Sequence, residues 1–399
     1  MTFYGWRIVA GAFLVLFTAY GAQYSFGVFF AALIDEFHWS RAGLAGVFTL
    51  YAFAYSVFGF PAGRLTDRWG PRTVITAGGI FIAVALCGMA SVTRLWQPYV
   101  LYGVVAALGM GTAYVPCNST VVKWFARRRG LAVGLASSGG SVGTFALPPV
   151  AQWLVGAAGW RTAYVVFGVV VLVTLTVVAR VMRRDPESMG LHPDGEPPPP
   201  HGVASGMSLG GAMRTAAFWL LAAAFAATWL PVFIPLVHLV SLARDLGHAP
   251  ATGAWLVSAL GAGAVAGRMI MGPVSDRVGR KPALIVAMGL QALAFAAFAT
   301  AHGMGALFGA ALLFGYSYGG VSALFPALVG DIFGRASAGA IVGCLFAVAG
   351  SMAAWGPLIA GAVYDVTRSY GLAFQLSGGA NLAAAALVAG IRPPRRAAG

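Results

Sequence analysis

Long apolar runs separated by short polar segments follow one another along almost the whole chain. Each run contains about 20 mostly apolar residues, which is the length that an α-helix needs to cross a bilayer. The predicted helices are residues 6–33, 42–62, 73–92, 97–122, 130–154, 162–181, 216–242, 252–273, 282–300, 304–330, 339–363 and 372–391. The pattern therefore predicts an all-α integral membrane protein with twelve transmembrane helices.

The composition agrees with a lipid environment. Hydrophobic residues make up 59% of the 399 residues, charged residues make up 9%, and the mean hydropathy is +0.81. A soluble domain carries about a quarter charged residues, so a soluble fold is excluded. Cys87, Cys117 and Cys344 lie far apart inside apolar runs, so we predict no metal site and no disulfide framework. We also expect no cofactor and no cleaved signal peptide.

Basic residues alternate between the predicted loops. With a cytoplasmic N-terminus, 19 lysines and arginines fall on the cytoplasmic side, five fall outside, and Arg268 lies within a span. The positive-inside rule produces such an excess, so both termini are expected in the cytoplasm. The net charge of +14 is then explained by topology and does not indicate nucleic-acid binding. The preference for arginine over lysine is typical of a prokaryotic inner (plasma) membrane protein.

One long polar segment divides the twelve spans into six and six. It covers residues 183–214 and contains four consecutive prolines at 197–200, so it is predicted to be an extended cytoplasmic linker. The predicted domains are an N-terminal six-helix bundle of residues 1–182 and a C-terminal six-helix bundle of residues 215–399.

Two short motifs recur at nearly one spacing. Asp67 follows the second predicted helix and Asp276 follows the eighth, and they are 276 − 67 = 209 residues apart. Phe125 follows the fourth helix and Phe333 the tenth, with a spacing of 333 − 125 = 208. Two independent markers at nearly the same offset indicate a duplicated six-helix unit. Parallel six-helix repeats characterise one large class of transporters, whose substrate site lies between the halves near the middle of the membrane.

The loops that contain these aspartates resemble the signature loop of the major facilitator superfamily, Gly-x-x-x-Asp-Arg-x-Gly-Arg-Arg. The resemblance implies the twelve-helix fold of that superfamily and a conformational role for Gly63, Asp67, Arg68, Asp276 and Arg277. Glycine permits close helix approach, and the aspartate can lie against a helix N-terminus and a neighbouring arginine. A loop that only sets topology would need the basic residues but not glycine and aspartate at fixed spacing.

Arg268 is the charged residue that the pattern places inside a span. Centring an arginine in a bilayer costs on the order of 3 kcal/mol or more, and intramembrane charges are usually functional. The predicted spans offer no obvious carboxylate partner, so we interpret Arg268 as the site of an anionic ligand, and a carboxylate suits the guanidinium group. The alternative is a side chain that extends to the inner surface, close to Asp276.

Other polar residues of the spans are candidate substrate contacts. The set is Asn118, His238, Tyr114, Tyr24, Tyr318 and Ser351. Asn118 and Tyr114 are four residues apart and share a helix face. His238 is interpreted either as a donor or proton carrier, or as a histidine satisfied near the outer interface. The tyrosines are interpreted either as ligand contacts or as packing and interfacial residues.

Residues 124–143 resemble the signature of the monocarboxylate porters and the related oxalate–formate exchangers, an aromatic-Phe pair followed by basic residues and glycines. The resemblance places Arg268 where that family carries its substrate-binding arginine. Animal members carry a lysine where Tyr24 stands and an aspartate where Ala264 stands, so their proton relay is not reproduced here.

These observations favour a secondary transporter of small monocarboxylates such as lactate, coupled to a proton and functional as a monomer. Carboxylate exchange without a proton, and a sensor that binds carboxylate without moving it, stay open as alternatives. A drug–proton antiporter is disfavoured because no acidic residue lies in the spans. No metalloprotease motif and no metal-ligand spacing is present, so we predict no catalytic residues and no enzyme activity.

Overall fold

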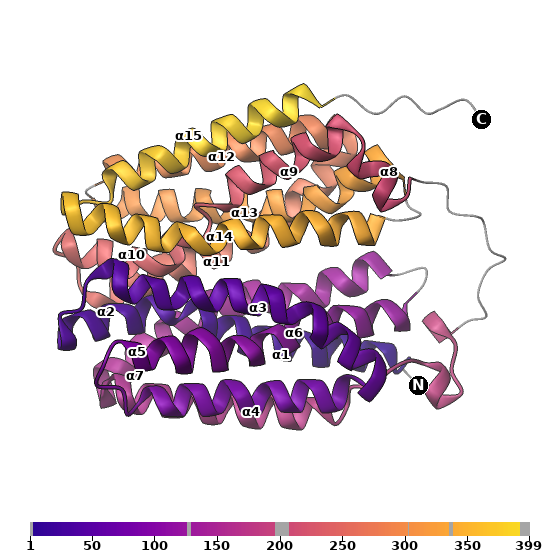
Figure 1. The fold of residues 1–399 in the computed structure, drawn as a ribbon, viewed down its shortest axis with the longest axis horizontal. Helices are drawn as coiled ribbons and strands as arrows, with labels where there is room; N and C mark the ends of the chain where they lie inside the picture. The colour runs from indigo at the N-terminus through magenta and orange to yellow at the C-terminus, as the bar shows by residue number, and fades with distance from the viewer. Residues whose placement is uncertain (1–2, 126–128, 196–206, 302, 335–337, 392–399) are drawn as a thin grey trace. The chain divides into compact units, whose positions relative to one another are not determined.

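A computed structural model describes residues 3–125, 129–195, 207–301, 303–334 and 338–391 (Figure 1). Within these ranges, the secondary structure is almost entirely helical. The first part of the chain contains α1 (Gly5–Tyr24), α2 (Phe26–Phe37), α3 (Arg41–Trp69), α4 (Pro71–Met89), α5 (Trp96–Pro98), the π-helix η1 (Tyr99–Ala106), α6 (Ala107–Trp124) and α7 (Arg129–Ala179). The second part contains α8 (Leu209–Met213), α9 (Ala216–Trp229), α10 (Phe233–Asp245), α11 (Pro250–Val278), α12 (Arg280–Thr300), α13 (Met304–Phe333), α14 (Ala338–Thr367) and α15 (Gly371–Gly390).

The described residues contain eleven helical segments that are long and apolar enough to cross a membrane. One of them is much too long for a single crossing, because the 51 residues of α7 would span about 76 Å against a hydrocarbon core of about 30 Å. Gly159 interrupts it with φ 79° and ψ 159°, so α7 consists of two successive helices. With α7 counted as two spans, the number is the predicted twelve, and the all-α membrane fold is confirmed.

The duplication predicted from two sequence motifs also appears in the backbone. Six residues with positive φ form three pairs with the same separation, because 247 − 38, 279 − 70 and 368 − 159 all equal 209. The pairs are His38 and Gly247, Gly70 and Gly279, and Gly159 and Arg368. Each of these residues lies where one helix ends and the chain turns towards the next. The two halves of the sequence therefore turn at equivalent positions.

Two of the spans are interrupted near their middles. Ser25 separates α1 from α2, and residues 230–232 separate α9 from α10. A break releases backbone groups that a continuous helix would pair, and within a membrane such groups need other partners. The hydroxyl of Tyr102 donates to the main-chain oxygen of Gln23, two residues before the first break, at 3.4 Å. Interrupted helices are typical of transporter substrate sites.

The chain forms two compact units. The first comprises residues 1–201 together with residues 236–258, and the second comprises residues 202–235 together with residues 259–399. This grouping differs from the predicted domains in residues 236–258, which the sequence assigned to the C-terminal bundle. The difference arises because these residues contact the first unit, whereas the sequence prediction followed chain order. The division at residues 183–214 into two six-helix bundles stays a prediction.

Part of the predicted linker lies outside the described residues, namely residues 196–206. The described part contains two short 3₁₀ turns, Glu187–Met189 and Pro193–Gly195, and the short helix α8. The main chain of Met207 donates to the oxygen of Phe333 at 2.8 Å, so the end of the linker is attached to the end of α13 within the second unit.

Candidate functional site

Arg268 lies well inside α11, 18 residues after Pro250 and 10 residues before Val278. At 1.5 Å per residue, it is about 27 Å from one end of the helix and about 15 Å from the other. Its side chain is half-buried and takes part in at least one interaction within the described residues. Asp276, the carboxylate considered as an alternative partner, forms an ion pair with Arg280 at 3.4 Å. The guanidinium has five N–H donors, so it can hold a protein group and still bind an anion.

The backbone of α11 packs directly against α13 beside Arg268. A Cβ added to Gly263 or Gly267 would collide with the main chain of α13, and one added to Gly315 or Gly319 would collide with the main chain of α11. Small residues allow membrane helices to approach this closely. The contact fixes the stretch of α11 that carries Arg268 relative to the helix that carries Tyr318.

Aromatic side chains surround Tyr318 in the second unit. Its ring stacks on Phe314 with a centroid distance of 6.4 Å, and it meets the edge of Trp229 at 6.2 Å. Trp229 in turn contacts Phe346 of α14 at 5.0 Å. Ser351, also on α14, donates its hydroxyl to the oxygen of Ala347 at 2.8 Å, which leaves the Ser351 oxygen available as an acceptor. The predicted residues Arg268, Tyr318 and Ser351 thus share one unit.

A second group of predicted residues lies in the first unit, on α1 and α6. The amide nitrogen of Asn118 donates to the oxygen of Tyr114 at 3.0 Å, and its amide oxygen accepts from Ser137 of α7 at 3.1 Å. The Tyr114 ring is 41% exposed and meets the edge of Tyr20 at 6.2 Å. Tyr20 contacts Tyr24, which is 6% exposed, at 5.8 Å. The structure therefore connects Asn118, Tyr114 and Tyr24 through Tyr20.

His238 belongs to the first unit as well, although it follows the linker in sequence. It is fully buried, and its ring stands at 86° to Phe30 with a centroid distance of 5.1 Å. The structure therefore groups His238 with α2 of the first unit, whereas Arg268 lies in the second unit.

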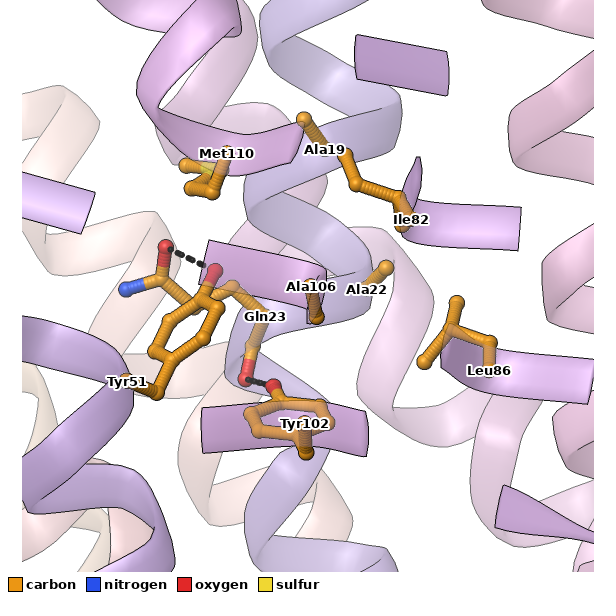
Figure 2. Close-up of a pocket in the computed structure, with 9 residues that line it drawn as sticks. All are labelled: Ala19, Ala22, Gln23, Tyr51, Ile82, Leu86, Tyr102, Ala106 and Met110. Atoms are coloured by element: carbon orange, nitrogen blue, oxygen red, sulfur yellow. Dashed lines mark hydrogen bonds between the residues drawn. The ribbon is translucent and has the colours of Figure 1, made fainter. Parts of the chain in front are cut away.

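The sequence did not predict a small cavity that is lined mainly by apolar side chains together with Gln23, Tyr51 and Tyr102. It measures about 10 Å³, which is room for about one water molecule and not for a carboxylic acid. Figure 2 shows the Tyr51 hydroxyl facing the amide oxygen of Gln23, at 3.2 Å, and the Tyr102 hydroxyl facing the main-chain oxygen of Gln23. The amide nitrogen of Gln23 is buried and has no hydrogen-bond partner among the described residues. The sequence pattern did not single out Tyr51 and Tyr102, because Gln23, to which both hydroxyls donate, is distant in sequence.

The structure describes the second signature loop more fully than the first. In the second, Arg280 contacts both Asp276 and Asp331 at 3.4 Å, so the loop is tied to the end of α13, and Arg277 is exposed. In the first, Gly63 is half-buried within α3 and Arg68 is exposed, while the side chain of Asp67 lies outside the described part of the structure.

Several charged residues form ion pairs that the sequence did not predict. Glu36 binds Arg161 at 2.7 Å and accepts from the indole of Trp160 at 2.5 Å. Two further ion pairs join Asp35 to Arg244 and Arg41 to Asp245. In the part of the chain that the structure describes, no three histidine, cysteine, aspartate or glutamate side chains gather as metal ligands.

Comparison with known proteins gives consistent results. The family model of the Major Facilitator Superfamily matches residues 12–242 and 221–399. Human monocarboxylate transporter 11 is 30% identical over 393 residues, covering 94% of this chain and 80% of the relative. Bovine monocarboxylate transporter 13 is 27% identical over 378 residues, covering 94% and 86%. Rat monocarboxylate transporter 4 is 28% identical over 384 residues, covering 94% and 80%.

Two solved structures share the fold at low sequence identity. A nucleoside transporter, NupG, aligns with a TM-score of 0.76 at 12% identity, covering 96% of this chain and all of the other chain. A bacterial homologue of the human lysosomal transporter Spinster, in an inward-facing and unoccupied conformation, aligns with a TM-score of 0.71 at 15% identity, covering 98% and 95%.

Proposed function

Since the chain belongs to the major facilitator superfamily and, within it, to the monocarboxylate transporter family, we propose that it carries small monocarboxylates such as lactate across the membrane by proton symport. The family is one of transporters and not of enzymes. Under this proposal the two six-helix halves alternately open to each side around the bound anion. The protein acts as a monomer in the inner (plasma) membrane, with both termini in the cytoplasm.

Arg268 is the observation that carries the proposal. Its charge cannot be removed, and the residue lies about 15 Å from the nearer end of a membrane-spanning helix, where its five N–H donors can bind an anion besides the protein group that it contacts. A carboxylate matches the guanidinium geometry with two parallel hydrogen bonds. One guanidinium, at Arg268, suits a monocarboxylate better than a dicarboxylate.

The remaining candidates would bind the rest of the substrate. Tyr318 and Ser351 share the unit of Arg268 and offer a phenol and a hydroxyl oxygen. Asn118 keeps one amide hydrogen and one lone pair beyond its two observed hydrogen bonds, and Tyr114 beside it is partly exposed. These groups suit the hydroxyl of a 2-hydroxy acid, and Tyr24 would support them through Tyr20.

The route of the proton distinguishes the proposal from its main alternative. The position that carries an aspartate in animal relatives is Ala264, which is 3% exposed and packed against Gly319 of α13, so it offers no proton carrier. The absence of a carboxylate at position 264 favours a proton that travels on the substrate or on His238. It also leaves carboxylate exchange without a proton as a second candidate function.

The first experiment is uptake of labelled lactate by purified protein in liposomes. Arg268→Gln should lower lactate uptake at least about tenfold, because a charge-assisted hydrogen bond contributes about 1.5–3 kcal/mol. Arg94→Gln removes the same charge from an exposed position and should leave uptake unchanged. Unaltered uptake by a folded Arg268→Gln protein would refute the proposed role.

The pH dependence separates the alternatives. Symport predicts net uptake driven by an inward proton gradient, and exchange predicts uptake only when internal anion is present. If His238 carries the proton, His238→Gln should lose gradient-driven uptake and keep exchange. Binding of lactate without any flux would identify a sensor.

A further inference from the structure

A buried glutamine on α1 has a hydrogen-bond donor that the proposed function does not use. Gln23 is 2% exposed, and its side-chain nitrogen has no hydrogen-bond partner among the described residues. That nitrogen carries two hydrogens, and a buried donor without a partner destabilises a protein. Such groups are rare in folded proteins, and each one calls for an explanation. A ligand that accepts a hydrogen bond would supply the missing partner.

Two buried tyrosines hold Gln23 in place. The Tyr51 hydroxyl, on α3, donates to the amide oxygen of Gln23 at 3.2 Å, which fixes the plane of the amide. The Tyr102 hydroxyl, on the π-helix η1, donates to the main-chain oxygen of Gln23 at 3.4 Å, which fixes the backbone that carries the side chain. Figure 2 shows the amide turned away from Ile82 and Leu86, which line the cavity beside it. The amide nitrogen is thus held in one orientation and shielded from water.

Gln23 shares a helix face with candidate substrate contacts of the first unit. It follows Tyr20 by three residues and precedes Tyr24 by one, so the three side chains project from neighbouring positions around α1. Tyr20 meets the edge of Tyr114 on α6, and Tyr114 accepts a hydrogen bond from Asn118. Gln23 also lies two residues before the break between α1 and α2, and interrupted spans are typical of transporter substrate sites.

We propose that the side-chain nitrogen of Gln23 donates a hydrogen bond to the oxygen on the second carbon of the substrate, and that Gln23 thereby determines specificity. The inference rests on the proposed function, in which Arg268 binds the carboxylate and leaves the second carbon to other groups. The hydroxyl oxygen of lactate and the keto oxygen of pyruvate both accept hydrogen bonds, whereas propionate has only hydrogens at that carbon. A shielded donor disfavours a ligand without an acceptor, because the donor then stays unpaired.

The test compares ligands that differ only at the second carbon. Displacement of labelled lactate from purified protein in detergent gives the dissociation constants of lactate, pyruvate and propionate without a flux measurement. The wild-type protein should bind propionate more weakly than lactate or pyruvate. Gln23→Met keeps the length of the side chain and removes the donor, so the ratio of the propionate to the lactate dissociation constant should fall about two- to twelvefold, the factor that one hydrogen bond contributes. Tyr51→Phe should lower this ratio by a smaller factor, because the amide keeps its donor but loses its fixed plane.

A second buried glutamine provides the matched control. Gln291, on α12 of the second unit, is 1% exposed, and Gln291→Met should leave the ratio of dissociation constants unchanged. If Gln23→Met fails to fold, Tyr51→Phe still tests the proposal, because it retains Gln23. An unchanged ratio in the folded variants of Gln23 and Tyr51, or an equal fall in Gln291→Met, would overturn the role of Gln23.

Lactate uptake by liposomes is measured separately. Uptake of lactate together with an unchanged ratio would contradict the role of Gln23 alone. A ratio that depends on Gln23, in a protein that moves no lactate, would instead contradict the proposed function alone.

Discussion

The side-chain amide of Asn118 is held in place inside a membrane-spanning helix. Hydrogen bonds to Tyr114 and Ser137 fix the plane of its amide, and one donor and one acceptor position remain open. A fixed amide loses little conformational entropy when a ligand binds, so its remaining hydrogen bonds contribute more to affinity.

Replacing Asn118 by alanine should therefore weaken lactate binding. A hydrogen bond contributes about 0.5–1.5 kcal/mol, so the KM for lactate should rise about two- to twelvefold in Asn118→Ala. Ser119 is the matched control, because its hydroxyl bonds within the helix to Pro116 at 3.2 Å. Lactate uptake at a series of concentrations measures both variants. An equal rise of KM in Ser119→Ala would show that both substitutions act by perturbing α6, and not through a contact between Asn118 and lactate.

At the scale of the helix, the contact between α11 and α13 determines the position of Arg268. Four glycines, two on each helix, allow the backbones to touch next to the arginine. The signature loop that follows α11 is tied to α13 a second time through Arg280 and Asp331. The two helices are thus joined both beside Arg268 and at the end of α11.

Alanine at Gly267 should push α11 away from α13. Overpacking of this kind costs about 1–3 kcal/mol, so we expect Gly267→Ala to lower the melting temperature in detergent and to raise the KM for lactate. Gly272 lies on the same helix with open space around its Cα, so Gly272→Ala should change neither value for the worse. An unchanged melting temperature and an unchanged KM in Gly267→Ala would show that α11 and α13 accommodate the added methyl group without moving Arg268.

At the scale of the whole molecule, the two halves repeat one backbone plan with different side chains. Equivalent turns lie 209 residues apart, and Tyr20 of α1 corresponds by this offset to Trp229 of α9. Both residues precede the break in their span. Their neighbours differ, because Tyr20 contacts Tyr24 and Tyr114, whereas Trp229 contacts Tyr318 and Phe346.

The orientation of the molecule can be tested directly. In a protein without native cysteines, we expect a cysteine at Ser188 to react with a membrane-impermeant reagent only after the membrane is opened, because the linker is predicted to be cytoplasmic. A cysteine at Trp39 should react in intact cells. Labelling with the reverse pattern would contradict the topology and would leave the helix count unaffected.

The sequence alone determined the helix count, the duplication and the family, because these depend on information that is local along the chain. The length of each apolar run predicts a span, and the loops around Asp67 and Asp276 reveal the repeat. Arg268 was found for the same reason, since a charge within an apolar run is visible in the sequence.

Only the tertiary structure decided which side chains meet. Arg41 and Asp245 are 204 residues apart, and Asn118 reaches Ser137 on another helix, and nothing along the chain specifies either contact. Chain order likewise placed residues 236–258 with the C-terminal bundle, whereas packing grouped them with the first unit. The physical reason is that the apolarity of a segment alone is enough to place it in the membrane. Which helices become neighbours depends instead on shape and charge complementarity between surfaces that form only when the helices pack.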